Sequence, residues 1–528
     1  EAEEPLRKTI ELRPDCVDAH LNMGGIYKDL GRLEEAETST RKAIELKPDL
    51  AEGYANLGSI FIDLGKLEEA ELSQRKAIEL KPDFGKAYVN LGSTLLNLGL
   101  IDQAIETTFK AIGLDPDNAI AYSNMGNILR LKGNFKKAIN MFEKALKINN
   151  DLSIAKSGLL RCEACICDWS NYSLRKNWLE SLGIKGEAID PLCAMSYEDD
   201  PSMHLRRARN FYIQKLYRKS ENIILKEKNR KRIGYFSSDF FDHATMHLMI
   251  RIFELHNKDE FDIYAYNYGK NNDDEMTSRL RDSVSTYRNV KNKNDLEIVL
   301  LARNDNLDIA VDLKGHTFGS RLTIFSHRVA PIQISYLGYP GSSGMDTIDY
   351  IIADKIVIPE ENKKFYSEKV INMPYCYQCN DDTKSISQDA ISRKKLHLPE
   401  KNIVFTCFNA NYKISPKEFD IWMRLLKNIK GSVLWLFQSN KWAAKNLCKE
   451  AERRGISSEK LIFAKKIALD KHLARYNFAD LALDTFNYNG HTTTSDSLWA
   501  GIPVLTKIGN SFSSRVSASL LNAIGLTE

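Results

Sequence analysis

The chain has 528 residues, enough for two to four domains, and its 43% hydrophobic and 27% charged residues are ordinary proportions for globular proteins. The net charge of +4 is small for this length, so neither a nucleic acid nor an anionic membrane is expected as a partner. No apolar run is long enough to predict a membrane-spanning helix.

The nine cysteines are an odd number and lack the spacing of a disulfide framework, which fits a reducing cytoplasm. Two clusters could supply metal ligands, RCEACIC at 161–167 and CYQC at 376–379. We favour buried or free thiols at both, and expect no metal. The chain starts without Met inside a repeat and ends after NAIGLTE, so we expect a fragment that is truncated at both ends.

Residues 1–151 form a regular array. Proline recurs every 34 residues, at Pro14, Pro48, Pro82 and Pro116, and several glycines and alanines keep the same register. This period is the signature of tetratricopeptide repeats, in which small residues let two helices approach closely and the proline turns the chain into the next unit. Four units follow a partial one, at 16–49, 50–83, 84–117 and 118–151.

Asparagine recurs once in the first helix of each unit, at Asn22, Asn56, Asn90 and Asn124. Asparagine is a poor helix former, so four in register need a reason. If they line the concave face, their amides can bind the backbone of an extended peptide. The alternative is that each side chain makes a hydrogen bond within its own repeat.

Residues 152–229 lose the period and look like two or three amphipathic helices that join the array to the rest of the chain. Within them, His204 and the nearby arginines 206, 207 and 209 are interpreted as a solvated or packing face. Residues 230–385 then alternate strands and helices, which predicts a parallel sheet covered on both faces.

Functional side chains should gather where the strands of that sheet end. Asp239, His243, His316, Tyr339 and the turn 340–344 occupy such positions. Residues 386–528 repeat the alternation and predict a second parallel domain, which implies a cleft between the two.

The last β-α-β unit, 484–506, carries the strongest local signal. After a turn, His491, Thr492 and Thr493 open a helix whose N–H groups and dipole favour an anion, and Asp496 on the same helix could accept hydrogen bonds from a ribose. These residues suggest a nucleotide diphosphate site. An ordinary capped helix remains the alternative.

Together with the repeats, six motifs carry a family resemblance over essentially the whole chain: SSDFFDHATMH, LGYPGSSG, YSEKVINMP, CFNANYKI, SVLWL and NGHTTTSDSLWAG. The chain resembles the O-linked N-acetylglucosamine (O-GlcNAc) transferases in their bacterial form, glycosyltransferase family 41. The resemblance implies a superhelix of tetratricopeptide repeats followed by an α/β GT-B fold of two Rossmann-like domains. It also implies UDP-GlcNAc as donor, no metal, and inverting transfer to Ser or Thr of protein acceptors bound by the repeats.

The resemblance also assigns roles to individual residues. The donor residues are His491, Thr492 and Thr493 for the diphosphate, Asp496 for the ribose, His472 and Arg475 for the uracil side, and Gly338, Pro340 and Gly341 for the sugar. Lys413 would neutralise the leaving phosphate, since without a metal a cation must stabilise it. His243 would sit near the acceptor hydroxyl, as general base or only as a positioning group, and His316 would lie beside it. The alternative for both histidines is a structural hydrogen bond at a strand end.

Two positions depart from the animal members of the family. Ala410 stands where they often have Gln, and Leu469 where they have Lys, which puts those nucleotide contacts in doubt. Three alternatives remain: a protein O-fucosyltransferase that uses GDP-fucose, a non-catalytic peptide-binding scaffold, and a transferase of glucose to Asn. The sequence leaves a homodimer open and does not identify the acceptor protein.

Overall fold

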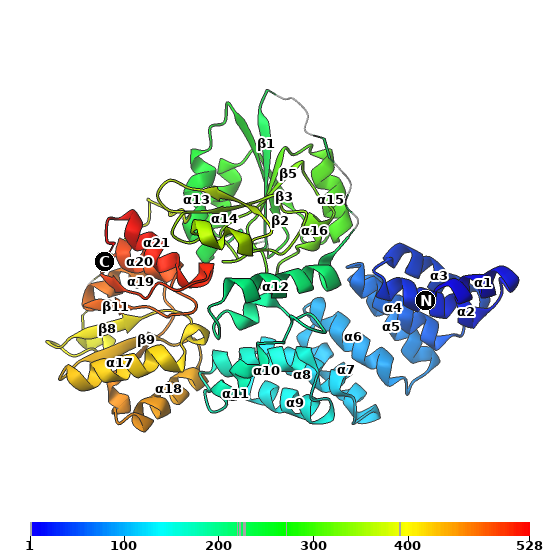
Figure 1. Ribbon diagram of the computed structural model, residues 1–528, viewed down its shortest axis with the longest axis horizontal. Coiled ribbons are helices and arrows are strands. Elements are labelled where there is room, and N and C mark those ends of the chain that lie inside the picture. The colour runs from blue at the N-terminus through cyan, green and yellow to red at the C-terminus, as the bar shows by residue number, and fades with distance from the viewer. Residues whose placement is uncertain are drawn as a thin grey trace. The chain divides into compact units, whose positions relative to one another are not determined.

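The computed structural model describes residues 3–218, 220, 223–224, 229–270, 272–389 and 392–527. Two compact units divide the chain, Glu1–Cys162 and Glu163–Glu528 (Figure 1). Part of the predicted transition, at residues 219, 221–222 and 225–228, lies outside the described residues. No helix within them combines the length and the hydropathy needed to cross a membrane.

The first unit consists of antiparallel helix pairs, as the 34-residue period predicts, and the predicted repeat array is confirmed (Figure 1). Its helices are α1 (Glu3–Leu12), α2 (Val17–Asp29), α3 (Leu33–Leu46), α4 (Ala51–Asp63), α5 (Leu67–Leu80), α6 (Gly85–Asn97), α7 (Ile101–Leu114), α8 (Ala119–Leu131) and α9 (Phe135–Ile148). Helix α10 (Ser153–Cys165) comes after them.

Glycine allows the close approach of the two helices in each pair. A Cβ atom on Gly126 of α8 would lie 2.7 Å from the ring of Phe142, which is fully buried on α9. On the neighbouring pairs, the same addition at Gly58 or Gly92 would meet a side chain at 2.3 Å. The recurring glycine is therefore a packing requirement of each unit.

Replacing Gly126 by Ala should destabilise the array by about 1–3 kcal/mol, because the buried ring of Phe142 must move to admit the methyl group. Gly25→Ala is the matched control, since a Cβ there meets nothing within 4 Å and α2 gains a better helix former. Urea unfolding followed by circular dichroism should show an earlier first transition for Gly126→Ala alone. Equal midpoints for the two variants would contradict this packing role.

The second unit begins with a segment that packs on both of its lobes. This segment contains α11 (Tyr172–Trp178) and α12 (Pro201–Phe211). Arg207 is fully buried and donates to the carbonyls of Leu182 and Leu179, so this part of the expected polar face is a packing face. Asp199 accepts hydrogen bonds from Ser511 near the C-terminus, at 2.7 Å.

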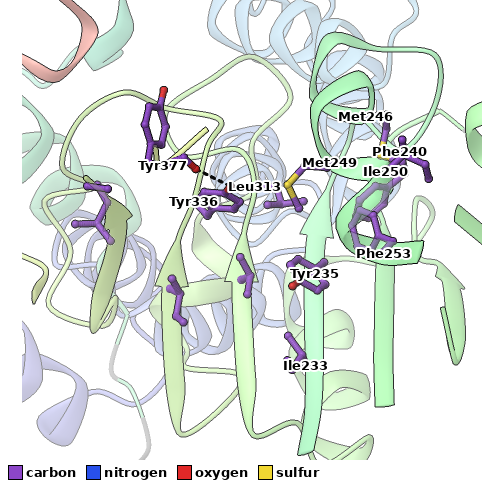
Figure 2. Packing of buried hydrophobic residues seen from close by; sticks show 14 of the residues in the cluster. Ile233, Tyr235, Phe240, Met246, Met249, Ile250, Phe253, Leu313, Tyr336 and Tyr377 are labelled. Carbon is purple, nitrogen blue, oxygen red and sulfur yellow. Dashed lines mark hydrogen bonds between the residues drawn. The ribbon is translucent and has the colours of Figure 1, made fainter. Parts of the chain in front are cut away.

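The N-terminal lobe is a parallel sheet in the order β3-β2-β1-β4-β5-β6-β7. Its strands are β1 (Lys231–Ser237), β2 (Phe261–Asn267), β3 (Thr286–Asn289), β4 (Ile309–Asp312), β5 (Ile332–Ser335), β6 (Tyr350–Ala353) and β7 (Lys369–Asn372). Helices α13 (Ala244–Leu255) and α14 (Glu275–Ser283) contribute to one core cluster, and α15 (Asp295–Asn304) and α16 (Thr323–Ser326) to another. Figure 2 shows the first cluster, in which α13 packs Met249 and Phe253 against Tyr235 and Leu313.

The C-terminal lobe is a second parallel sheet, in the order β10-β9-β8-β11-β12. Its strands are β8 (Val404–Cys407), β9 (Val433–Phe437), β10 (Leu461–Ala464), β11 (Leu481–Leu483) and β12 (Val504–Leu505). The helices are α17 (Pro416–Asn428), α18 (Lys441–Arg453), α19 (Leu469–Arg475), α20 (Thr492–Trp499) and α21 (Val516–Ala523). The prediction of two parallel α/β domains is confirmed.

Residues from the C-terminal end of the chain complete the core of the N-terminal lobe. Phe512, Val516 and Leu520 belong to the same buried cluster as the residues of β1 and α13. The Ser519 hydroxyl donates to Asp354 beyond the end of β6, at 2.6 Å. The two lobes are thus joined by a shared hydrophobic core as well as by the chain.

Candidate functional site

A buried carboxylate organises the loop between β11 and α20. Asp484 follows β11 directly, and its Oδ1 accepts hydrogen bonds from the Gly490 backbone N–H at 2.6 Å and from Asn409 Nδ2 at 3.0 Å. Its Oδ2 accepts from the Thr506 hydroxyl at 2.7 Å. Burial raises the pKa of Asp484, while these donors favour the ionised form. The loop is therefore held in one conformation with the N-terminus of α20 at its end.

Asn409, which our sequence analysis left without a role, links that loop to the start of α20. It donates to the Thr485 hydroxyl at 2.9 Å and accepts a short hydrogen bond from the Thr493 hydroxyl. Thr493 thus uses its side chain to fix the helix start. The signal was present in the motif CFNANYKI, where a polar residue comes shortly after the end of β8.

Lys413 and His491 meet at the same loop. The Lys413 ammonium donates to the carbonyl of Asn489 at 2.8 Å and lies 4.0 Å from the centroid of the Tyr488 ring. Burial lowers the pKa of Lys413 to about 8, although Asp484 opposes the shift. His491 precedes α20, and burial, followed by the Lys413 charge, holds the pKa of its imidazole well below the usual value. The structure therefore brings together a lysine and a helix N-terminus, the groups that stabilise a diphosphate.

The two residues that the sequence places on the uracil side lie on α19 beside an aromatic wall. The Arg475 guanidinium lies 4.3 Å from the centroid of the Phe408 ring, and the His472 ring lies 5.4 Å from the same ring. Within the described residues, His472 Nδ1 and Arg475 Nε are buried without a hydrogen-bond partner. Burial lowers the pKa of His472 to about 3 and that of Arg475 to about 10. Unsatisfied polar atoms beside an aromatic surface suit a planar polar ligand such as a base.

The N-terminal lobe contains a cavity of about 550 Å³ at the carboxyl ends of β1, β2, β4 and β5. Asp239, His243, Lys270, Lys314 and Gly338 are among its lining residues. The buried Lys314 ammonium donates to Asp239 Oδ2 at 2.6 Å. Asp239 and His243 were expected at this edge of the sheet from the sequence, whereas Lys314 was not.

His243 is the N-cap of α13, and its Nδ1 accepts a hydrogen bond from the backbone N–H of Thr245 at 3.2 Å. Burial lowers the pKa of its imidazole, while the nearby Asp239 carboxylate raises it. A neutral ring whose Nδ1 accepts a bond carries its proton on Nε2. His243 lines the cavity, and an imidazole with its proton on Nε2 can donate a hydrogen bond from that atom, which favours the positioning role over that of general base.

His243→Ala should lose about 1 kcal/mol of stability, because the first turn of α13 loses its cap, whereas His243→Asn should keep most of it. Thermal unfolding of the two variants checks the cap. If His243 only positions groups, kcat/KM of both variants should keep the acidic limb of the wild-type pH profile. Loss of that limb in His243→Asn would instead identify His243 as the base.

His316 lies at the same strand edge but does not line the cavity. Its Nε2 donates to the carbonyl of Ser343 at 2.7 Å, and its ring packs edge-on against Phe211 and Tyr339. Burial lowers the pKa of His316, which favours the neutral ring. This geometry favours the alternative of a structural hydrogen bond over the expected catalytic role.

The glycine-rich turn after β5 is mostly buried and packs closely against neighbouring segments. Gly338 lines the cavity, but a Cβ on it would lie 2.1 Å from the carbonyl oxygen of Leu313, so the backbone closely approaches the segment after β4. Pro340 and Gly341 are buried. The backbone N–H of Ser343 donates to Glu368, which anchors the turn. Close backbone approach to a sugar remains an expectation for all three residues, and only Gly338 lines the cavity.

The repeated asparagines of the array are exposed or half-buried. Binding of a peptide backbone by their amides requires this accessibility. Asn124 donates to the Ser93 hydroxyl at 2.8 Å, and Asn56 accepts from Lys86 at 3.2 Å. Both bonds cross from one repeat to the next. The alternative of a bond within each repeat is therefore wrong for these two residues, while peptide binding stays a prediction.

The two cysteine clusters hold no preformed ligand set among the residues described. Cys376 lies 3.3 Å from the Ser519 hydroxyl, and Cys379 contacts the sulfur of Met249. None of the nine cysteines, all of which are described, forms a disulfide, and over the described ranges no group of three or more His, Cys, Asp or Glu side chains is arranged to hold a metal ion.

Family models match both parts of the chain. The glycosyl transferase family 41 model matches residues 209–388 and 384–528, and tetratricopeptide repeat models match 17–50, 51–84, 85–118 and 119–152. The last of these ends one residue beyond the predicted array.

Similar proteins carry consistent names. A probable UDP-N-acetylglucosamine–peptide N-acetylglucosaminyltransferase SEC of Arabidopsis thaliana is 32% identical over 70% of this chain and 40% of its own length. The UDP-N-acetylglucosamine–peptide N-acetylglucosaminyltransferase of Caenorhabditis elegans is 28% identical over 69% of this chain and 43% of its own. This chain thus spans less than half the length of these curated relatives. A solved mutant of the Thermobaculum terrenum O-GlcNAc transferase is 25% identical, with a TM-score of 0.63 over 90% of this chain and 86% of that one.

Proposed function

Because the chain belongs to glycosyl transferase family 41, we propose that it transfers N-acetylglucosamine from UDP-GlcNAc to Ser and Thr hydroxyls of proteins. The single observation that carries this proposal is the meeting of Lys413 with the N-terminus of α20 on the loop held by Asp484. The two parallel lobes behind a repeat array match the GT-B arrangement of the similar solved transferase.

The reaction forms a bond from the acceptor oxygen to the anomeric carbon and breaks the bond from that carbon to the oxygen of the β-phosphate, while the hydroxyl proton passes to a donor phosphate or to water. Negative charge then grows on the leaving UDP. The Lys413 ammonium and the backbone N–H groups at the start of α20 supply the opposite charge, in a partly buried setting where electrostatic stabilisation is strong. This chemistry requires no metal.

The remaining donor groups would be held by the rest of the C-terminal lobe. His472 and Arg475 have unsatisfied buried atoms beside Phe408, which suit the polar edge of uracil. Asp496 lies on α20 and would accept from ribose hydroxyls. The N-terminal cavity, with His243 donating from Nε2, is the place for the sugar and the acceptor hydroxyl.

The acceptor would be an extended segment bound along the array. The exposed or half-buried side chains of Asn22, Asn56, Asn90 and Asn124 support this mode, since amides can pair with any peptide backbone. The lack of a disulfide among the nine described cysteines is compatible with a reducing compartment such as the cytoplasm.

Calorimetric titration of the full chain with UDP, UDP-GlcNAc and GDP-fucose tests the donor. UDP and UDP-GlcNAc should bind, and GDP-fucose should give no heat. Binding of GDP-fucose alone would move the assignment to fucosyl transfer. If a folded sample gave no heat of binding with any of the three nucleotides, the alternative of a non-catalytic peptide-binding scaffold would be favoured.

A further inference from the structure

A buried lysine from the segment between the lobes reaches helix α20. The side chain of Lys384 is only 1% exposed, and its ammonium donates to Asp496 Oδ1 at 3.1 Å and to Asn380 Oδ1 at 2.7 Å. Lys384 and Asn380 lie outside the motifs that suggested the function. Burying an ammonium is costly, so this lysine has to be held by its partners.

Only one carboxylate oxygen of Asp496, Oδ1, contacts Lys384. The Asp496 side chain is 6% exposed, and among the residues that the structure describes no hydrogen bond ends on Oδ2. Burial raises the pKa of Asp496, and the Lys384 charge opposes that shift most strongly. Lys384 therefore favours the ionised form of the carboxylate, and its bond to Oδ1 leaves Oδ2 to accept another bond.

The segment that carries Lys384 is also fastened to α19. The backbone N–H of Ser387 donates to the carbonyl of Asp470 at 3.2 Å, and Lys471 pairs with Asp389 at 3.2 Å. The segment thus touches both the helix with Asp496 and the helix that carries the uracil-side pair. On α19, His472 Nδ1 and Arg475 Nε are buried and have no hydrogen-bond partner among the described residues. Such unsatisfied atoms indicate that a polar ligand binds beside them.

We propose that Lys384 is a positioning residue of the donor site, which holds Asp496 ionised with Oδ2 ready to accept a bond from a ribose hydroxyl. The inference rests on the proposed function and deepens it, because it makes recognition of the ribose by Asp496 depend on a residue outside the motifs that suggested the function. Lys384 itself acts through Asp496 and need not touch the nucleotide.

The test compares two nucleotides on the full chain by calorimetry, UDP and 2′,3′-dideoxy-UDP, which lacks the ribose hydroxyls. The variants are Lys384→Met and Lys384→Arg. The control is Lys471→Met, which breaks the exposed ion pair of the same segment. Lys384→Met should weaken UDP about tenfold and dideoxy-UDP less than about twofold, because only the hydroxyl bond is lost. Lys384→Arg should recover most of the affinity, and Lys471→Met should bind both nucleotides nearly as the wild type does.

Equal weakening of both nucleotides by Lys384→Met, or no weakening of either, would overturn the inference while wild-type binding of UDP keeps the proposed function. No UDP binding by the folded wild type would overturn both. If thermal unfolding shows that Lys384→Met does not fold, Lys384→Gln takes its place, since its amide can still donate a hydrogen bond to Asp496 but carries no positive charge. UDP should then lose more affinity than dideoxy-UDP does, although less than in Lys384→Met, because one hydrogen bond to the carboxylate is kept.

Discussion

Replacing Lys413 by Ala should lower kcat by about 10²- to 10³-fold, because the leaving diphosphate loses the cation held beside the start of α20. UDP release from UDP-GlcNAc in the presence of a mixed library of Ser- and Thr-containing peptides measures this effect. Lys417→Ala is the matched control, since Lys417 is exposed on the neighbouring helix α17. Equal loss in both variants, or no loss in Lys413→Ala, would exclude Lys413 from the site.

The same lysine predicts a pH dependence. Burial lowers the pKa of Lys413 to about 8, so the ammonium is present below this pH and is lost as the pH rises through it. Only the ammonium attracts the diphosphate, and UDP affinity should therefore fall above about pH 8 in the wild type. Lys413→Arg, which stays charged, should not show this fall. Calorimetry at several pH values separates the two proteins.

Replacing Asp484 by Asn should cost about 3 kcal/mol of stability and abolish UDP binding. The carboxylate accepts from Gly490, Asn409 and Thr506, and an amide presents its own N–H groups to at least one of these donors. The loop that carries Asn489 and precedes α20 then loses its anchor. Urea unfolding and UDP titration should both report the change.

Asp480→Asn is the matched control for this prediction. Asp480 precedes the same strand, β11, and its Oδ2 accepts from the Val404 backbone N–H at 2.7 Å, but its side chain is 45% exposed. Water can therefore replace the lost interaction, and the stability loss should stay below about 1 kcal/mol. If Asp484→Asn bound UDP as the wild type does, the loop would not depend on the buried carboxylate.

The sequence predicted those parts of the fold that depend on local patterns. The 34-residue period located each helix pair, and alternation of strands and helices located both parallel sheets, because those signals come from neighbouring residues. The strand-end rule correctly put Asp239 and His243 at the cavity. His316 also follows its strand, β4, but its Nε2 donates to Ser343 and it does not line the cavity, so its role stays a prediction.

The contacts that were missed join residues far apart in the chain. Lys384 pairs with Asp496 across 112 positions, and Lys314 pairs with Asp239 across 75. No periodicity or turn signal marks a lysine as buried, because its burial depends on a partner that only the fold supplies. Asn409 could have been found, since a buried strand ends just before it.

The contribution of Phe512, Val516 and Leu520 to the core of the N-terminal lobe has a consequence for biosynthesis. A growing chain emerges N-terminus first, so β1 to β7 leave the ribosome well before these three side chains do. Part of the apolar core of the N-terminal lobe therefore stays exposed to water until the segment that contains α21 has been synthesised. Closure of this core therefore has to follow synthesis of the whole C-terminal lobe, and until then the exposed apolar surface favours aggregation of the nascent chain.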